Sequence, residues 1–261
     1  MSEQAKIHDA ILLVAGVGAR LRPLTDTQPK CLIEINGVPL LIRLLRQLHE
    51  QGIQHVALAT GYLEAKIRSC VAGHSNLPEV SFCPNPNYSE TNNAASLLGA
   101  LPAVAGRPFI LCDGDILVRK SGWLKDLLAD SRGNILAMIS PEEMGAEEMK
   151  IELGEDDRVS ALSKGLDPAK SAGESVGVQI ISADFYDVLR ERLEAMSEDE
   201  RANSYYEDMF ADIMGDAHPF YAHEIPVSSW TEIDTLEDLE VARQLYASWQ
   251  DTPEDSTPTN N

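Results

Sequence analysis

Short apolar runs alternate with helical patterns through the first half of this 261-residue chain, and this alternation constrains the fold more than any other feature. Residues 10–15 (AILLVA) form a continuous apolar run that ends at a glycine, as is typical of a parallel strand buried on both faces. The same patterns predict further strands at 55–60, 80–83 and 108–112, and helices at 39–51, 63–71 and 94–104. Strands that alternate with helices favour an α/β fold with an open, mostly parallel sheet and helices on both faces.

The pattern changes after about residue 140. Residues 149–165 predict a two-stranded hairpin around the turn GEDD, and 175–182 predict a further strand. Helices are predicted at 184–196, 205–214 and 236–249. Residues 250–261 (QDTPEDSTPTNN) are polar and rich in proline, so we expect a disordered tail.

These patterns predict one domain over residues 1–249. Its first part reaches about residue 140 and holds the strand–helix alternation. Its second part, about 141–249, forms a smaller lobe of strands and helices. We therefore expect a mixed, mostly parallel sheet of the Rossmann-like kind, extended by this lobe.

The charge is distributed unevenly along the chain. Residues 1–130 hold 12 basic and 12 acidic side chains, whereas residues 131–261 hold 9 basic and 30 acidic ones, so the second half accounts for the whole net charge of −21. Such a chain repels nucleic acid and anionic membrane surfaces, which require clustered lysine and arginine. The acidic half suits a cationic small molecule, or it only keeps the protein soluble; both interpretations stay open.

Three further observations concern the compartment. The longest apolar stretch, residues 10–19, is far short of the ~20 residues that a membrane span needs. Residues 1–10 do not have the basic-then-apolar plan of a secretory signal. The four cysteines show no C-x-x-C spacing, so we expect buried, reduced thiols without zinc or disulfides. We expect a soluble, cytoplasmic protein.

A glycine-rich loop with two cations follows the first strand. Residues 13–25 read LVAGVGARLRPLT, and a Pro-Lys pair ending at Lys30 comes next. Glycines let main-chain N–H groups approach phosphate oxygens. The loop is no Rossmann fingerprint, because Leu21 stands in place of the third glycine, and no Walker loop, because no Gly-Lys-Ser/Thr follows. Arg20 and Lys30 offer positive charge to a ligand with several phosphates.

Two groups of carboxylates stand at informative places. Asp113 and Asp115 come directly after the predicted strand 108–112, at the edge where parallel sheets bind ligands. Asp234 lies in the segment WTEIDT, where it or Thr235 could equally cap the following helix. Carboxylate oxygens are the ligands that Mg²⁺ prefers.

The whole string 13–25, with its Pro-Lys pair, resembles the signature L-A-A-G-x-G-x-R-L-x-P-L-T of nucleotidyltransferases that activate phosphorylated sugars and alcohols. The one departure is Val14 in place of the first alanine. The resemblance implies the fold of the nucleotide-diphospho-sugar transferases. It also implies that the strand end contacts the base and that the loop, with its cations, binds the triphosphate. The residues to which these roles would fall are Val14, Ala15, Gly16, Gly18, Arg20 and Lys30.

The same resemblance implies a metal site. The family has a Gly-Asp after the strand whose Asp holds the metal, which points to Asp115, with Asp113 as the runner-up and a nucleotide contact. Residues 230–239 resemble the family element W-x-E-I-D-x-x-x-D-L, whose Asp is a second metal ligand, here Asp234. Glu232 is then an acid of the acceptor site or a support for the metal ligands. The implied cofactor is Mg²⁺, and Arg20, Lys30, Asp115 and Asp234 are the expected catalytic residues.

Four short segments resemble one branch of this family, the bacterial, LicC-like phosphocholine cytidylyltransferases. They are YSETNN (88–93), SKG (163–165), ESVG (174–177) and YYED (205–208). The branch implies that Asn92 contacts the nucleotide. It also implies an acceptor site, and the residues assigned to it are Asn93, Lys164, Glu174, Tyr205, Tyr206, Glu207, Asp208, Trp230 and Glu232. Aromatic faces and acids suit a quaternary ammonium, which donates no hydrogen bonds.

The expected activity is Mg-dependent transfer of a cytidylyl group from CTP to phosphocholine. Alternatives are another acceptor (aminoethylphosphonate or inositol phosphate), a sugar-1-phosphate uridylyl- or thymidylyltransferase, and an inactive nucleotide-binding regulatory subunit. The oligomeric state stays open, with a homodimer as one option. A phosphate acceptor is already an anion near neutral pH, so no general base is required, and the six histidines lie outside every motif.

Overall fold

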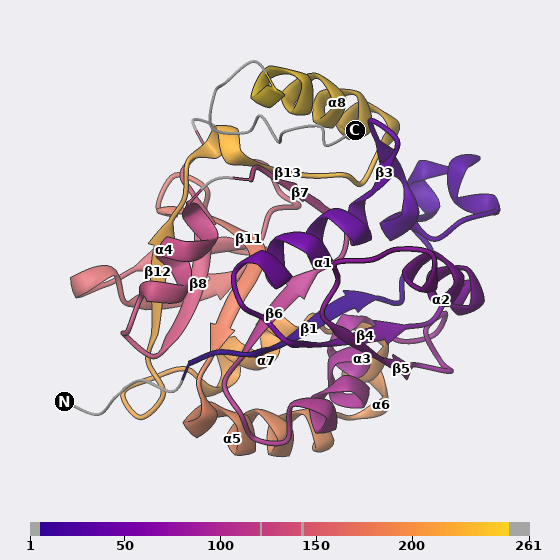
Figure 1. The fold of residues 1–261 in the computed structure, drawn as a ribbon. Helices are drawn as coiled ribbons and strands as arrows, with labels where there is room; N and C mark the ends of the chain where they lie inside the picture. Colours follow the sequence, from indigo (N-terminus) through magenta and orange to yellow (C-terminus); the bar gives the residue numbers. More distant parts are fainter. Residues whose placement is uncertain (1–5, 121, 142–143, 251–261) are drawn as a thin grey trace.

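The computed structural model describes residues 6–120, 122–141 and 144–250. Within these residues, nine strands form one mixed sheet, and helices cover both of its faces (Figure 1). The strands of this sheet are β1 (Asp9–Val14), β4 (His55–Thr60), β5 (Glu79–Pro84), β6 (Phe109–Asp113), β8 (Asn134–Ile139), β9 (Lys150–Leu153), β10 (Val159–Ser163), β11 (Gly173–Ile181) and β12 (Phe220–Glu224). The helices are α1 (Leu40–Glu50), α2 (Glu64–Ala72), α3 (Asn93–Ala100), α4 (Trp123–Ala129), α5 (Ala183–Glu194), α6 (Glu198–Asn203), α7 (Tyr206–Ile213) and α8 (Leu236–Gln250).

The centre of the sheet is parallel. β1 lies between β4 and β6, with Leu12 opposite Leu58 on one side and Cys112 on the other. β5 continues the parallel pairing beyond β4, whereas β11 pairs antiparallel with both β6 and β8. The strand order is β10-β9-β11-β6-β1-β4-β5, with β8 beside β11 and β12 beside β8. This arrangement confirms the mixed sheet with helices on both faces that the sequence predicts.

The first strand is buried on both faces, as its continuous apolar run predicts. Side chains alternate across a strand, so its residues divide between two cores. Ala10, Leu12 and Val14 pack in the core that α1, α2 and α4 cover. Ile11 and Leu13 pack in the core that α3, α5 and α7 cover. The polar loop after β1 therefore starts from a rigid support.

Some elements differ from the prediction. The helix expected at 94–104 ends at Ala100 and continues as a 3₁₀ turn through Leu101–Val104, because Pro102 has no N–H to donate and crowds the preceding turn. The hairpin expected at 149–165 is confirmed by the antiparallel pairing of β9 and β10. The sequence predicted no element between 113 and 148, although α4 and β8 lie there.

A two-stranded ribbon lies outside the main sheet. β7 (Ile116–Val118) pairs antiparallel with β13 (Trp230–Glu232), which places Glu232 opposite Ile116. The N–H of Ile233 donates to the Asp115 carbonyl at 3.0 Å. This ribbon brings the segment around residue 232 beside the loop that follows β6, although more than 100 residues separate them.

The last helix packs on the loops rather than on the main sheet. In Figure 1, α8 lies above β7 and β13. It closes a third group of buried side chains, which we call the C-terminal core: Leu21, Ile33, Ile35, Leu40, Leu117, Ile233, Leu239, Ala242 and Trp249. The loop after β1, the hairpin of β2 (Glu34–Ile35) and β3 (Val38–Pro39), and the ribbon all contribute to this core.

The tail expected at 250–261 lies outside the described residues from 251 onward. The division into two parts near residue 140 stays a prediction. Among the described residues, none of the helices combines the length and the apolar composition that a membrane crossing demands.

Candidate functional site

A cavity of about 310 Å³ opens at the carboxyl ends of the central parallel strands. Ala15 and Gly16 reach it from the end of β1, and Asp113 reaches it from the end of β6. The N-terminal half of β11, the loop before β9, the start of α7 and the ribbon also line it, as do the start of α3 with the segment before it, Arg20, and Lys164 after β10. Open α/β sheets bind ligands at this edge, because the strand ends and their loops converge there.

Three carboxylates from two distant segments meet in this cavity. Asp115 follows β6, and Glu232 and Asp234 lie at and just after the end of β13; one oxygen of each lies within 4.8 Å of the others. We call these three residues the acid cluster. Asp115 Oδ1 is buried and has no hydrogen-bond partner among the described residues. Three carboxylates form the oxygen-only donor set that a hard divalent cation requires, so the acid cluster can hold a metal ion.

Two cations pair with the acid cluster. Lys30 Nζ donates to Asp115 Oδ2 at 2.8 Å and also to Asp234, and Arg20 pairs with Asp234. The Lys30 side chain is 11% exposed, whereas that of Arg20 is 63% exposed and lines the cavity. Burial disfavours the charge on Lys30, but the two carboxylates outweigh burial and raise the Lys30 pKa. Lys30 is therefore a fixed charge that balances the acids.

The loop after β1 is shaped by Gly18. Its φ of +66° lies in the left-handed region, and a Cβ there would lie 2.9 Å from the Lys30 Cβ. The hydroxyl of Thr25 donates to the Gly18 carbonyl at 2.8 Å. Gly18 thus allows the loop to close around Lys30, while Gly16 lines the cavity.

Asp113 rests on a buried network. Enclosure by protein raises the pKa of Asp113 well above its ordinary range, and the charges of Glu207 and Asp115 add to this effect. The hydroxyl of Tyr206 donates to Asp113 Oδ2 at 3.1 Å, which opposes the rise in the Asp113 pKa. The same hydroxyl accepts a hydrogen bond from Gln179 Nε2 at 2.9 Å. The network fixes the position of Asp113 between the acid cluster and α7.

Two residues of the YYED segment do not line the cavity, which corrects the expected acceptor contacts. Tyr206 is 0% exposed, and its ring packs against Phe210 with centroids 5.3 Å apart. Asp208 accepts the backbone N–H of Tyr205 at 2.7 Å and so caps the start of α7. The reason is helical geometry: α7 begins at Tyr206 and directs it into the core. Both residues hold the cavity wall rather than facing a ligand.

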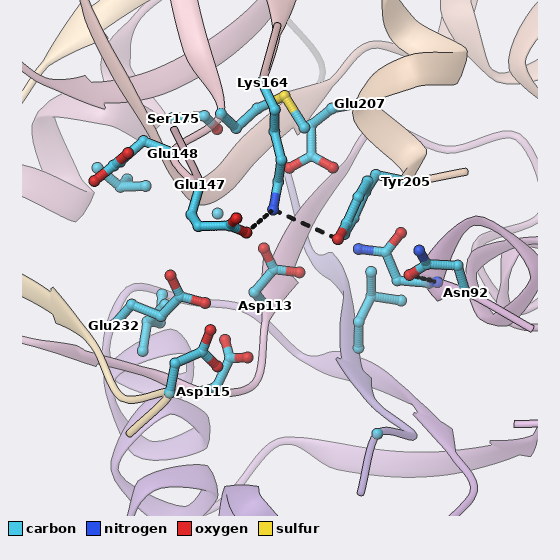
Figure 2. Close-up of a pocket in the computed structure, with 18 of the residues that line it drawn as sticks. Asn92, Asp113, Asp115, Glu147, Glu148, Lys164, Ser175, Tyr205, Glu207 and Glu232 are labelled. Carbon is cyan, nitrogen blue, oxygen red and sulfur yellow. Dashed lines mark hydrogen bonds and ion pairs between the residues drawn. The ribbon is translucent and has the colours of Figure 1, made fainter. Parts of the chain in front are cut away.

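Apart from the acid cluster, Figure 2 shows a second group of side chains around Lys164. Lys164 Nζ lies 3.4 Å from the Tyr205 hydroxyl, 4.5 Å from the centroid of that ring and 3.9 Å from the Glu147 carboxylate. Glu207 extends from the first turn of α7 toward the same space. We call Glu147, Lys164, Tyr205 and Glu207 the Lys164 group.

Several acids in the cavity have raised pKa values. Burial, with the charge of Glu148, raises the pKa of Glu174 to about 7. Burial also raises the pKa of Glu207 to about 7. The Glu232 side chain reaches solvent at the cavity mouth, but surrounding protein atoms and the charge of Asp115 raise its pKa to about 8. Each of these groups favours a nearby cation, because a cation stabilises the charged form.

A buried lysine organises the cavity wall. Lys150 is 1% exposed, and its Nζ donates to the carbonyls of Ala146, Glu148 and Lys164 at 3.3, 3.1 and 2.8 Å. These bonds tie the loop before β9 to the loop after β10. Glu147 and Lys164 both belong to the segments that Lys150 holds, so the geometry of the Lys164 group depends on it.

The cavity brings together most of the site residues predicted from the sequence. Those that line it are Ala15, Gly16, Arg20, Asn92, Asn93, Asp113, Asp115, Lys164, Glu174, Tyr205, Glu207, Trp230, Glu232 and Asp234. Those that do not are Val14, Gly18, Lys30, Tyr206 and Asp208. Asn92 also caps α3, since its side chain accepts the N–H of Asn93 at 2.8 Å.

Sequence reasoning missed the glutamates before β9. Glu147 and Glu148 line the cavity, but the acidic segment around them reads like a solvated surface. Ser175 also lines the cavity from β11. The signal that would have marked the segment is Lys150, which lies between the apolar residues Met149 and Ile151 at the start of β9, because a buried lysine is rare without partners.

Comparisons with known proteins show what this chain is similar to. The family model of the MobA-like NTP transferase domain matches residues 10–251. The 2-aminoethylphosphonate cytidylyltransferase of Lancefieldella rimae is 31% identical over 114 residues, which are 44% of this chain and 45% of that protein. The choline-phosphate cytidylyltransferase of Streptococcus pneumoniae is 26% identical over 237 residues, which are 90% of this chain and 97% of that protein.

Among solved structures, the inositol-1-phosphate CTP transferase of T. maritima superposes with a TM-score of 0.78 and 22% identity, over 95% of this chain and 98% of that one. This likeness shows a shared fold. The chain spans about half the length of the first curated relatives that it matches, with shares of 45%, 47% and 51%.

Proposed function

The chain belongs to the family of MobA-like NTP transferase domains, and on this basis we propose that it transfers a cytidylyl group from CTP to a small organic phosphate or phosphonate with a cationic end. The observation that carries the proposal is the acid cluster, which lies beside the glycine-rich loop at the carboxyl edge of the sheet. The cytidylyltransferases among the relatives support CTP as the donor. Phosphocholine and 2-aminoethylphosphonate both belong to the proposed acceptor class.

In the proposed reaction, an acceptor phosphoryl oxygen attacks the α-phosphorus of CTP. One P–O bond forms there, the bond from the α-phosphorus to the oxygen that bridges the β-phosphorus breaks, and pyrophosphate leaves. The attacking oxygen is already anionic, so no side chain has to remove a proton. The barrier is repulsion, since two unit charges ~4 Å apart repel by about 4 kcal/mol at an effective dielectric constant of about 20. The protein's task is therefore to position the anions and neutralise them.

Residues at the end of β1 suit the nucleotide. The main chain at Ala15 and Gly16 lines the cavity without bulky side chains, and the exposed guanidinium of Arg20 can reach phosphate oxygens. Lys30 stays with Asp115 and Asp234, where it compensates their charge. In this proposal Arg20 contacts the triphosphate directly, whereas Lys30 acts through the acid cluster.

The acid cluster fits a magnesium ion. Asp115 Oδ1 is buried without a hydrogen-bond partner among the described residues, and Glu232 is held beside two like charges. Both features are unfavourable unless a cation is bound. Asp115 and Asp234 would hold the ion, with Glu232 beside it. When bound, Mg²⁺ supplies positive charge against the phosphate oxygens of the substrates.

The direct test is pyrophosphate release with Mg²⁺ and a matrix of substrates. CTP, UTP and dTTP are each combined with phosphocholine, ethanolamine phosphate, 2-aminoethylphosphonate, inositol phosphate and sugar 1-phosphates. We expect product with CTP and the aminoalcohol acceptors. Turnover confined to UTP or dTTP with sugar phosphates would replace this function by sugar activation. CTP binding without pyrophosphate from any pair would indicate a regulatory protein.

Asp115→Asn separates the role of the acid cluster from stability. The variant keeps the volume of the side chain and removes one charge, so we expect turnover to fall by about 10²–10³-fold. The free energy of unfolding should change little, because Lys30 retains Asp234 as a partner. Circular dichroism and denaturant titration check the fold. Wild-type turnover in Asp115→Asn at saturating magnesium would remove Asp115 from the site.

A further inference from the structure

The Lys164 group contains a buried carboxylate oxygen that lacks a partner. Glu207 is 5% exposed and lines the cavity, and its Oε2 has no hydrogen-bond partner among the described residues. Leaving such an oxygen unpaired is unfavourable, so native structures satisfy nearly all of them. Figure 2 shows the carboxylate facing the cavity. A donor is therefore expected to reach Glu207 from the cavity side.

The position of Lys164 indicates which donor suits this place. Its Nζ lies over the ring of Tyr205 and near the Glu147 carboxylate, and its charge also acts on Glu207. Figure 2 shows the ammonium pointing into the space between these side chains. A primary ammonium has three N–H donors and can serve several oxygens at once. The Lys164 group already accommodates one ammonium of this kind, from the chain itself.

A quaternary ammonium needs different surroundings. It donates no hydrogen bond and is held by aromatic faces. In the described part of the chain, the ammonium of Lys164 lies over the ring of Tyr205, and Tyr206 is fully buried. Trp230 is half-buried, and its indole N–H donates to the Val176 carbonyl at 2.9 Å. Tyr88 and Trp230 also line the cavity, but the Glu207 oxygen without a partner among the described residues requires a hydrogen-bond donor, which a trimethylammonium does not have.

Resting on the cytidylyl transfer proposed above, we propose that the acceptor ends in a primary ammonium and that Glu207 selects it by accepting its hydrogen bonds. The acceptor is then a zwitterion of the aminoalkyl phosphate or phosphonate class. Its phosphoryl end pairs with Lys164, and its ammonium donates hydrogen bonds to the carboxylates of Glu207 and Glu147. Trimethylation of the nitrogen removes every donor and leaves the Glu207 oxygen unpaired.

The raised pKa of Glu207 agrees with this assignment. Burial raises the pKa to about 7, so the charged form lacks sufficient compensation from the protein alone. A bound ammonium restores that compensation. The Lys164 charge acts in the same direction, but it is shared with Glu147.

The experiment uses a methylation series. Ethanolamine phosphate and its N-methyl, N,N-dimethyl and N,N,N-trimethyl forms (the last is phosphocholine) are compared at saturating CTP and Mg²⁺. We expect kcat/KM to fall with each methyl group and by about tenfold or more across the series, since each methyl removes a charge-assisted hydrogen bond. Equal or higher kcat/KM for phosphocholine would overturn the proposal.

Glu207→Gln tests the selecting residue. The substitution keeps the volume and removes the charge. We expect a loss of about tenfold in kcat/KM for ethanolamine phosphate, mostly through KM, a smaller loss for phosphocholine and an unchanged KM for CTP. Glu191→Gln, on the exposed face of α5, is the matched control and should behave as wild type. An unchanged preference between the two acceptors in Glu207→Gln would exclude Glu207 as the determinant.

Calorimetry keeps this inference separate from the proposed reaction. Absence of pyrophosphate release with CTP and every acceptor would refute cytidylyl transfer. The choice of ammonium is then decided by binding of ethanolamine phosphate and phosphocholine to the wild type. Tighter binding of the primary amine, lost in Glu207→Gln, supports the inference. Equal or weaker binding overturns it.

Discussion

At the scale of single residues, the cavity gathers charges that burial disfavours. Lys30 keeps its charge because Asp115 and Asp234 flank it. Glu207 and Glu232 have raised pKa values, because protein atoms replace their water. When charged, Glu207 and Glu232 lower the stability of the folded state, and in the proposed function they prepare the site for cations.

Glu207 should make stability depend on pH. Its pKa rises from 4.5 to about 7 on folding, so the folded state binds its proton more tightly than the unfolded state does. Stability from this group is therefore present below pH 4.5 and lost as the pH rises to about 7. We expect Glu207→Gln to exceed the wild type in free energy of unfolding by roughly 1–3 kcal/mol at pH 8, and by little at pH 5.

Denaturant titrations of both proteins at pH 5 and pH 8 measure this difference. Glu191→Gln, exposed on α5, provides the control and should change the free energy of unfolding by less than about 0.5 kcal/mol at either pH. A difference for Glu207→Gln that is equal at both pH values, or larger at pH 5, would contradict the raised pKa.

At the scale of elements, the start of α8 shows how one segment serves two purposes. The Asp238 carboxylate accepts the N–H groups of Asp234 and Thr235 at 3.0 and 2.8 Å, and Thr235 Oγ1 accepts the N–H of Asp238 at 3.1 Å. Thr235 and Asp238 thus cap the helix. The Asp234 carboxylate is left for the acid cluster, so the cap formed by Thr235 and Asp238 is compatible with the proposed role of Asp234 at a metal ion.

Lys150 should control acceptor binding through the two loops that it joins. Lys150→Met removes three hydrogen bonds to carbonyls, and with them the anchor of the segments that carry Glu147 and Lys164. We expect the KM for the acceptor to rise by about tenfold, the KM for CTP to change by less than about twofold, and stability to fall by about 2 kcal/mol.

Steady-state kinetics with each substrate varied in turn separate these effects. Lys170→Met is the matched control, because Lys170 is an exposed lysine between β10 and β11 with a surface ion pair to Asp167. Equal rises in both KM values would show that Lys150 supports the fold in general rather than the acceptor end of the cavity.

At the scale of the whole molecule, the C-terminal core joins the parts of the site that are most distant in sequence. Leu21 stands next to Arg20, and Ile233 stands next to Asp234; both are buried together under α8. The packing of α8 therefore sets the distance between the glycine-rich loop and the Asp234 carboxylate.

Leu239→Ala should weaken this connection. Leu239 is 2% exposed, so we expect a loss of about 2–5 kcal/mol in the free energy of unfolding. At a temperature well below unfolding, kcat should also fall by about ten- to hundredfold, since catalysis tolerates little misplacement. The control is Leu189→Ala on α5, which is 0% exposed in another core. It should lose similar stability but retain kcat, and equal kcat losses in both variants would exclude a specific role for the C-terminal core.

Much of the fold follows from local pattern. The apolar run at 10–15 predicts a buried strand, and the structure shows why the run is continuous: both faces of β1 are covered. The glycines and Arg20 mark the loop at the cavity. Periodicity and turn residues act over a few positions, so the structure that they favour can be predicted from the sequence. The same holds for Asp115, which comes two residues after the end of β6.

Contacts between distant segments decided the rest. The YYED segment looks like a ligand surface, yet the rotation of α7 places Tyr206 in the core and Glu207 in the cavity. The ribbon of β7 and β13 brings Asp234 close to Asp115. Lys150 holds the acidic loop before β9 by a hydrogen bond to the Glu148 carbonyl, so that this loop lines the cavity. Which side of a helix faces inward, and which strands pair, depend on the packing of the whole chain, and no local pattern encodes it.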